Sequence, residues 1–201
     1  MRNELEINKA EQRKGRMVFL MIAIFFAVPI LVVMLMFKFN WKPAGHSIGE
    51  LVQPPRLVIA PSTLMDSHNN PQTKFWLDKW NLVFVANHCE KSCMDRLHDI
   101  RQIHVSTYKD IFRVQRVLIT QQDDVKSIQE KYPKLIIINQ SKEDVENLAT
   151  QFNINGEDAL IANRVYFIDP LGHIMMSYPI SAKAADIRKD LVKLLKFSWA
   201  G

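Results

Sequence analysis

The sequence is poor in glycine and cysteine, and both shortages exclude classes of protein. Its 201 residues include only 6 glycines and 9 prolines, which excludes collagen-like and low-complexity chains. Two cysteines cannot build a disulfide-rich scaffold, and a zinc site would need additional histidine or carboxylate ligands. The length is too short for two full-sized domains. With 48% hydrophobic and 23% charged residues, the chain is neither disordered nor a protein with many membrane spans.

One segment, residues 17–37, lacks charge altogether. Its 21 residues are enough to cross a bilayer core as a helix, which needs about 20. Pro29 lies within this run, where a membrane helix tolerates it. The apolar core of a signal peptide is shorter, about 7–15 residues, and ends in a small-residue cleavage site that this segment lacks. We therefore expect a single, uncleaved transmembrane helix.

The distribution of basic residues predicts the orientation of this helix. Arg13, Lys14 and Arg16 directly precede the apolar run. By the positive-inside rule, residues 1–16 are cytoplasmic and everything after the helix lies outside. In a bacterial cell this is a single-pass inner-membrane protein with a periplasmic C-terminal domain. The formal net charge of +5 then reflects membrane topology in large part, and we expect no nucleic-acid partner.

The composition changes again after the apolar run. Residues 38–72 hold five of the nine prolines, a density typical of extended chain and turns. We interpret them as a periplasmic tether that becomes a strand extension, with a short edge strand at 56–60 and a turn at 66–71. The folded domain is predicted to occupy residues 73–201.

Within this domain, apolar runs of strand length alternate with helical patterns. The predicted strands are residues 81–86, 114–120, 135–139, 165–169 and 173–178, the last two forming a hairpin. The predicted helices are residues 92–108, 123–132, 141–152 and 182–197. The order β-α-β-α-β-α-β-β-α requires a parallel core built by right-handed crossovers. It predicts an α/β, thioredoxin-like domain after the single transmembrane helix.

The two cysteines, Cys89 and Cys93, lie where the first strand gives way to the first helix. Open α/β sheets place their chemistry at this edge, and helix amides together with Lys91 stabilise a thiolate there. A disulfide needs Cβ atoms about 3.8 Å apart, closer than the ~5–6 Å of residues i and i+4 on a helix, so Cys89 must precede the helix. Two buried cysteines or a purely stabilising bridge are the alternatives. Closing so short a loop stabilises little, which favours redox or metal chemistry.

Several motifs together resemble the Sco/SenC family of membrane-anchored, thioredoxin-like proteins. They are the N-terminal anchor, residues 79–85 leading into Cys89-x-x-x-Cys93, and the segment Val165–Gly172, which is similar to the family's hairpin. The resemblance covers about residues 55–197 and is closest to small Sco-like proteins associated with oxidase assembly. It implies a cytochrome c oxidase subunit or its assembly factors as partners.

The resemblance also implies a copper site, from which this sequence departs. Sco proteins bind copper with two cysteines and a histidine nine residues before the hairpin proline, a position held here by Ile161. Thioredoxins place a cis-proline where this chain has Asn163. The implied ligands of Cu(I) are therefore Cys89 and Cys93. The adjacent His88 is a candidate third ligand, a residue that tunes the thiolate, or a bystander.

The other histidines are expected to play no part in this site. We interpret His98 and His104 as surface or packing residues of the first helix. His173 follows the hairpin turn and should lie about 20 Å from the cysteines, because six residues of strand rise about 3.3 Å each. His46 and His68 fall in the predicted tether.

Three functions are compatible with these features. The first is a membrane-tethered factor for cytochrome c oxidase assembly that acts as a dithiol reductant or a Cu(I) handler, since two soft thiolates suit Cu(I). The second is a general periplasmic thiol-disulfide oxidoreductase in which Cys89 leads the attack. The third is a non-catalytic interaction module whose cysteines only staple the loop.

Overall fold

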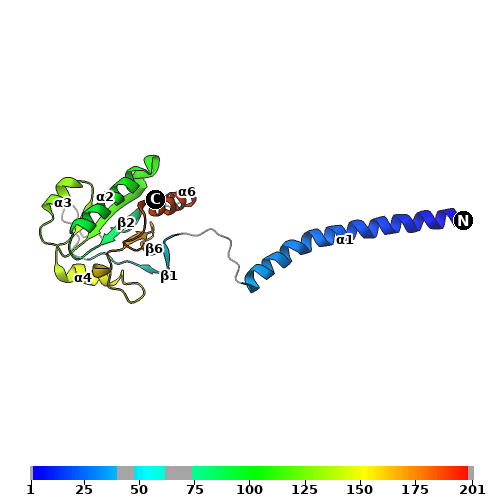
Figure 1. Ribbon diagram of the computed structural model, residues 1–201, viewed down its shortest axis with the longest axis horizontal. Coiled ribbons are helices and arrows are strands. Elements are labelled where there is room, and N and C mark those ends of the chain that lie inside the picture. Colours follow the sequence, from blue (N-terminus) through cyan, green and yellow to red (C-terminus); the bar gives the residue numbers. More distant parts are fainter. Residues whose placement is uncertain (1, 40–47, 62–73, 199–201) are drawn as a thin grey trace. The chain divides into compact units, whose positions relative to one another are not determined.

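The computed structural model describes residues 2–39, 48–61 and 74–198. The chain forms two compact units, Met1–His46 and Ser47–Gly201. The first contains helix α1, Arg2–Lys38, shown in blue in Figure 1, which continues through Pro29. Its segment Arg13–Lys38 is long and apolar enough to cross a membrane. One such helix near the N-terminus is consistent with a single-pass anchor or with a signal sequence.

The second unit is built on a six-stranded sheet with the order β1-β6-β5-β2-β3-β4. Strands β2, β3 and β4 run parallel to one another, and β5, β6 and β1 add antiparallel pairs on the other side of β2. The predicted parallel core and hairpin are thereby confirmed, as is the thioredoxin-like α/β class. The strands are β1 Glu50–Leu57, β2 Trp80–Val85, β3 Val114–Ile119, β4 Ile136–Ile138, β5 Val165–Ile168 and β6 His173–Tyr178.

Helices cover both faces of this sheet (Figure 1). Along β2, Leu82 and Phe84 pack into the cluster that includes α2 and α6, whereas Val83 and Val85 pack into the cluster that includes α4 and α5. Alternate side chains of a strand point to opposite faces, so a strand buried on both sides reads as a continuous apolar run. The helical elements are α2 Lys91–Val105, η1 Tyr108–Arg113, α3 Lys126–Lys131, α4 Lys142–Thr150, α5 Ala159–Ala162 and α6 Ala184–Phe197.

The prediction of the first helix of the domain was wrong at its C-terminal end. α2 ends at Val105 rather than near Tyr108, and the chain continues through the 3₁₀ helix η1. The hydroxyls of Ser106 and Thr107 donate to the carbonyls of the preceding helical turn, and Tyr108 has a positive φ of 49°. Short hydroxyl side chains compete in this way with continued helix, and the left-handed Tyr108, two residues after the C-cap Ser106, keeps the chain from resuming it.

The next two predicted helices are shorter in the structure. α3 begins at Lys126 rather than Asp123, because the carboxylate of Asp124 accepts from the Lys126 amide and forms a turn before the helix. α4 ends at Thr150 instead of Phe152, but its predicted N-cap is confirmed: the Ser141 hydroxyl accepts from the amide of Asp144. α6 likewise begins two residues after the predicted start.

The predicted edge strand at residues 56–60 lies too late in the chain. The observed strand β1 is Glu50–Leu57, and its pairing with β6 is irregular between Leu51 and Arg56, the stretch that contains Pro54 and Pro55. Proline has no amide to donate, so an edge strand is the only place in a sheet that accepts such a pair. The predicted turn at 66–71 lies outside the described residues.

One short element was missed. α5, Ala159–Ala162, is capped by the Asp158 carboxylate, which accepts from the Leu160 amide, and ends at the left-handed residue Asn163. Four residues are too few to show helical periodicity in a sequence. This helix matters because it contacts the loop that leads to Cys89.

Candidate functional site

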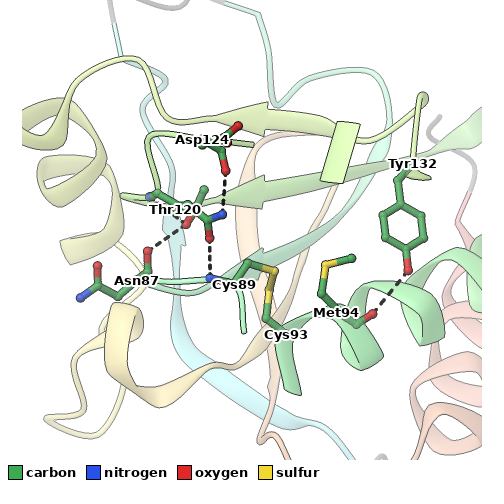
Figure 2. The surroundings of a disulfide bond; sticks show 8 residues. Asn87, Cys89, Cys93, Met94, Thr120, Asp124 and Tyr132 are labelled. Atoms are coloured by element: carbon green, nitrogen blue, oxygen red, sulfur yellow. Dashed lines mark hydrogen bonds between the residues drawn. A yellow bond between two sulfur atoms is a disulfide. The ribbon is translucent and has the colours of Figure 1, made fainter. Parts of the chain in front are cut away.

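Cys89 and Cys93 form a disulfide bond at the start of α2 (Figure 2), with their Cα atoms 4.9 Å apart. Cys89 precedes the N-cap residue Glu90, and Cys93 is the third residue of the helix. This is the placement that the geometric argument from the sequence required. The side chain of Cys93 is 2% exposed, whereas Cys89 is only partly buried. Cys89 is therefore the sulfur that an incoming thiol reaches more readily.

The loop before the disulfide is held by the loop that follows β3. The amide of Cys89 donates to Gln122 Oε1 at 2.8 Å, and the hydroxyl of Thr120 donates to the Asn87 carbonyl at 2.9 Å. The side-chain amide of Gln122 also donates to the Asp124 carbonyl at 2.7 Å (Figure 2). Sequence reasoning missed Thr120 and Gln122, and the only signal for them was their position directly after a buried strand.

The second support of this loop is α5. The amide of Asn87 donates to the Leu160 carbonyl at 2.9 Å, which places α5 directly beside the chain that leads to Cys89. Ile161, the position of the copper-binding histidine in the Sco resemblance, belongs to this helix and is 73% exposed. Asn163, the position of the thioredoxin cis-proline, ends it with a φ of 50°. Both positions thus belong to the element that supports the Cys89 loop, although neither carries the family residue.

A buried arginine supports α2 one turn after the cysteines. Arg96, 6% exposed, donates to the carbonyls of Ala182 and Ile180 in the loop between β6 and α6, and it lies 3.5 Å from a carboxylate oxygen of Asp99. This guanidinium fixes the β6–α6 loop against the helix. The cysteine end of the domain is thereby anchored on several sides.

The start of α2 favours a thiolate. Glu90 makes no side-chain hydrogen bond to the helix, and the first turn contains no acidic residue. The first amides of a helix have no partner within it, and with the helix dipole they stabilise negative charge. Lys91, exposed at the first position, adds a positive charge. After reduction, a thiolate at Cys89 would be favoured by these amides and by Lys91.

The histidines are dispersed. His88 is exposed beside Cys89, and His98 is exposed on α2. His104 is half-buried, and its Nε2 lies 3.0 and 2.9 Å from the carbonyl oxygens of Ile111 and Val114. Burial lowers the pKa of His104 below its usual value.

His173 lies far from the cysteines, as expected. Val165 lies at the disulfide end of β5 and pairs with Tyr178, the last residue of β6. His173 is the first residue of β6 and therefore lies at the end of the strands opposite the disulfide. His46 and His68 are outside the described residues.

No group of three or more histidine, cysteine, aspartate or glutamate side chains is arranged to hold a metal ion within residues 2–39, 48–61 and 74–198. The donor set at the site is thus two sulfur atoms once the disulfide is reduced. Two thiolates fit Cu(I), which accepts two soft ligands, and do not fit Cu(II), which prefers tetragonal nitrogen and oxygen donors.

The fold of the domain is similar to that of several solved structures. Apo Sco1 of Thermus thermophilus superposes with a TM-score of 0.57 at 18% identity, covering 76% of this chain and 99% of that one. Copper-bound ScoI of Arabidopsis thaliana gives 0.53 at 19% identity, with 75% and 99% covered. A thiol:disulfide interchange protein from Bacteroides sp. gives 0.52 at 15% identity, with 71% and 91% covered. These likenesses show a shared fold.

Sequence comparison assigns the family. No curated protein matches the chain significantly. Residues 80–198, however, match the family model of the transmembrane-like, thioredoxin-like C-terminal domain, and this range spans the sheet from β2 to the end of α6. The protein belongs to the family of transmembrane-like, thioredoxin-like C-terminal domains.

Proposed function

We propose that this protein is a membrane-tethered, Sco-like factor that assists cytochrome c oxidase assembly by dithiol–disulfide exchange or Cu(I) transfer at Cys89 and Cys93. The observation that carries the proposal is the disulfide itself, which lies at a helix N-terminus with one sulfur buried and the other accessible. A bridge across so short a loop contributes little to stability through closure entropy, so reactivity is the better reason for it.

The exchange needs only these two residues and a client disulfide. The Cys89 thiolate attacks one client sulfur, which forms a mixed disulfide and releases the other client sulfur as a thiolate. The Cys93 thiolate then attacks the Cys89 sulfur, closes the Cys89–Cys93 bond and releases the second client thiolate. Two electrons pass to the client, and a reducing dithiol protein must return two electrons to this domain.

The copper branch of the proposal treats Cu(I) as cargo. In the reduced state, two sulfur donors four residues apart suffice for Cu(I), and His88 is the nearest candidate for a third ligand. Sco proteins of Arabidopsis thaliana and yeast, which share this fold, have been solved with copper bound, and this motivates the choice of metal. The tether follows from α1, whose basic N-terminal flank would keep residues 1–16 in the cytoplasm.

Thiol trapping of the full chain in membranes tests the redox function. Alkylation should add two groups only after treatment with a reductant, and Cys89 should be modified faster than Cys93 at neutral pH. In a host that lacks the gene, the wild type should restore oxidase, whereas the Cys89→Ser/Cys93→Ser variant should not. Full restoration of oxidase by the double variant would show that the two cysteines have no role in this function, and it would overturn the proposal.

Copper binding distinguishes a factor that assists assembly of a copper enzyme from a general thiol-disulfide oxidoreductase. An anaerobic Cu(I) titration against a competing chelator should give one Cu(I) per chain, abolished by Cys89→Ser/Cys93→Ser. Ile161→His should add a nitrogen ligand beside the cysteines and improve retention of Cu(II), because α5 adjoins the Cys89 loop. Equal Cu(I) binding by the wild type and the cysteine variant would remove copper from the proposal.

A general periplasmic thiol-disulfide oxidoreductase is the second candidate. It is favoured by the absence of a histidine at position 161 and by the structural likeness to the Bacteroides thiol:disulfide interchange protein. Under this function many envelope proteins, rather than oxidase alone, should accumulate mixed disulfides with a Cys93→Ser variant. Reporter fusions after residue 42 should be active only as periplasmic reporters under either function.

A further inference from the structure

A cavity lies at the end of the domain away from the disulfide. It encloses about 590 Å³ between the last turns of α2, the helix η1, the start of β3 and the loop between α3 and β4. Val114 and Ile136, which open the parallel strands β3 and β4, lie in its wall. The cysteines follow the C-terminal end of β2, which runs parallel to β3 and β4, so this cavity is separate from the redox site.

Arg116 gives the cavity its chemical character. This residue of β3 lines the cavity, is only 5% exposed, and its buried Nε has no hydrogen-bond partner. Among the residues that the structure describes, no carboxylate forms an ion pair with it. A guanidinium stays charged in proteins, so it cannot escape this environment by releasing a proton. A buried charge without a partner is strongly unfavourable.

Other basic residues around Arg116 add to the positive charge of the cavity. Lys79, Arg101 and Lys134 also line the cavity, and no aspartate or glutamate of the described chain does. Burial, and then repulsion from Arg101, lower the pKa of Arg116. His104 completes this side of the wall, and burial favours its neutral form. The cavity therefore presents several fixed cations and lacks the anion that would balance them.

The other buried arginines of the domain have acceptors for their guanidinium groups, which Arg116 lacks among the described residues. The Nε of Arg164, a residue 5% exposed, also lacks a partner in the part of the chain that the structure describes, but its two Nη atoms pair with the carboxylates of Glu50 and Glu157 and donate to the Ser177 hydroxyl. Arg96 donates to two carbonyls, as described above. The fold thus supplies acceptors where an arginine has a structural role. At Arg116 it supplies a cavity instead.

We propose that this cavity binds a small anionic ligand, a carboxylate or a phosphate on an apolar body, whose charge pairs with Arg116. The guanidinium presents a planar set of donors that matches both anions in a bidentate manner. The apolar body is indicated by the rest of the wall, where Val105 is 50% and Phe112 84% exposed. The volume lies within the range of small-molecule pockets, about 300–1,000 Å³, and far exceeds that of a lone phosphate.

Calorimetric titration of the full chain in nanodiscs tests this proposal with four probes: phenyl phosphate, benzoate, inorganic phosphate and neutral benzamide. Phenyl phosphate or benzoate should bind one-to-one and at least about tenfold more tightly than benzamide, since a charged hydrogen-bond partner supplies that much. The anion that binds more tightly identifies the headgroup as phosphate or carboxylate. Inorganic phosphate should bind more weakly than phenyl phosphate if the apolar wall contributes.

Charge-removing variants locate the site. Arg116→Gln should weaken the binding of the preferred anion at least about tenfold, whereas Lys126→Gln, at an exposed lysine outside the cavity, should leave it unchanged. If Arg116→Gln does not fold, Lys134→Gln at the exposed rim should still weaken binding measurably. Equal affinities for wild type and cavity variants, or no binding of any anion at about 10 mM, would overturn the proposal and leave the guanidinium solvated by water.

Discussion

The two ends of the sheet differ in whether the protein itself supplies partners for their polar groups. At the disulfide end, the amide of Cys89, the carbonyl of Asn87 and the amide of Asn87 are each paired with an element far away in the sequence. At the other end, Arg116 is buried in a cavity lined by further cations and without a carboxylate among the described residues. At the disulfide end the backbone of the loop is paired within the protein, although the buried Oδ1 of Asn87 has no partner in the described part of the chain, whereas the other end lacks a counter-charge.

This difference bears on function. A redox site must hold its loop in place while a covalent bond forms and breaks, so its backbone is satisfied by the protein itself. A binding site leaves a polar group unpaired for its ligand, at a cost to stability. Helix α2 spans both ends, and Tyr132, which lines the cavity, donates at 3.4 Å to the carbonyl of Met94, next to Cys93 (Figure 2).

The largest effect is expected from the cysteines taken one at a time. Cys93→Ser leaves the attacking thiolate but removes the group that resolves the mixed disulfide, so client adducts should accumulate on non-reducing gels. Cys89→Ser should form none, because the remaining sulfur is only 2% exposed. Turnover should fall to background in both variants. Adducts that form on Cys89→Ser rather than on Cys93→Ser would reverse the two roles.

The two buried arginines give the sharpest contrast in stability. Arg116→Met should raise the free energy of unfolding by about 1–3 kcal/mol without added anions, because it replaces an unpaired charge with an apolar chain of similar length. Arg164→Met should lower it by about 2 kcal/mol, because it breaks the pairs with Glu50 and Glu157 and leaves Ser177 unpaired. Urea unfolding of the full chain in detergent measures both. A loss of stability in both variants would show that Arg116 is satisfied within the fold.

A smaller effect is expected from the hydrogen bond to the Cys89 amide. Gln122→Ala removes its acceptor and should cost about 1 kcal/mol of stability, and it should accelerate reduction of the disulfide by dithiothreitol as the loop loosens. Gln121→Ala is the matched control, because only the backbone amide of Gln121 bonds the loop, to the Asn87 carbonyl. Equal reduction rates in the two variants would contradict a role for the Gln122 side chain.

The smallest effect concerns His104, at the cavity end. Its folded-state pKa is lowered by burial, so the stabilising effect of the neutral ring is complete above the unfolded pKa of about 6.5 and is lost as pH falls through the folded pKa. His104→Gln keeps a donor for the carbonyls of Ile111 and Val114 but does not titrate. Between pH 7.5 and 5.5, the wild type should lose more stability than the variant. Identical losses would assign the acid sensitivity to other groups.

Local patterns in the sequence were sufficient for the framework. The uncharged run predicted a long apolar helix, which is present as α1, and the alternation of apolar strands and helical segments predicted the parallel core and the hairpin. The spacing of Cys89 and Cys93 required the first cysteine to precede the helix, as it does. These features depend on residues close together in the chain, so periodicity and spacing report them directly.

Only the tertiary structure decided what surrounds each end of the sheet. Gln122 meets Cys89 across 33 residues, α5 meets Asn87 across more than 70, and β1 pairs with β6 across more than 100. Arg116 belongs to a strand that was predicted correctly, yet no local pattern shows that its guanidinium lacks an acceptor. Such partners are chosen by chain crossings and packing over the whole sheet, so burial and charge balance become visible only once the chain is folded.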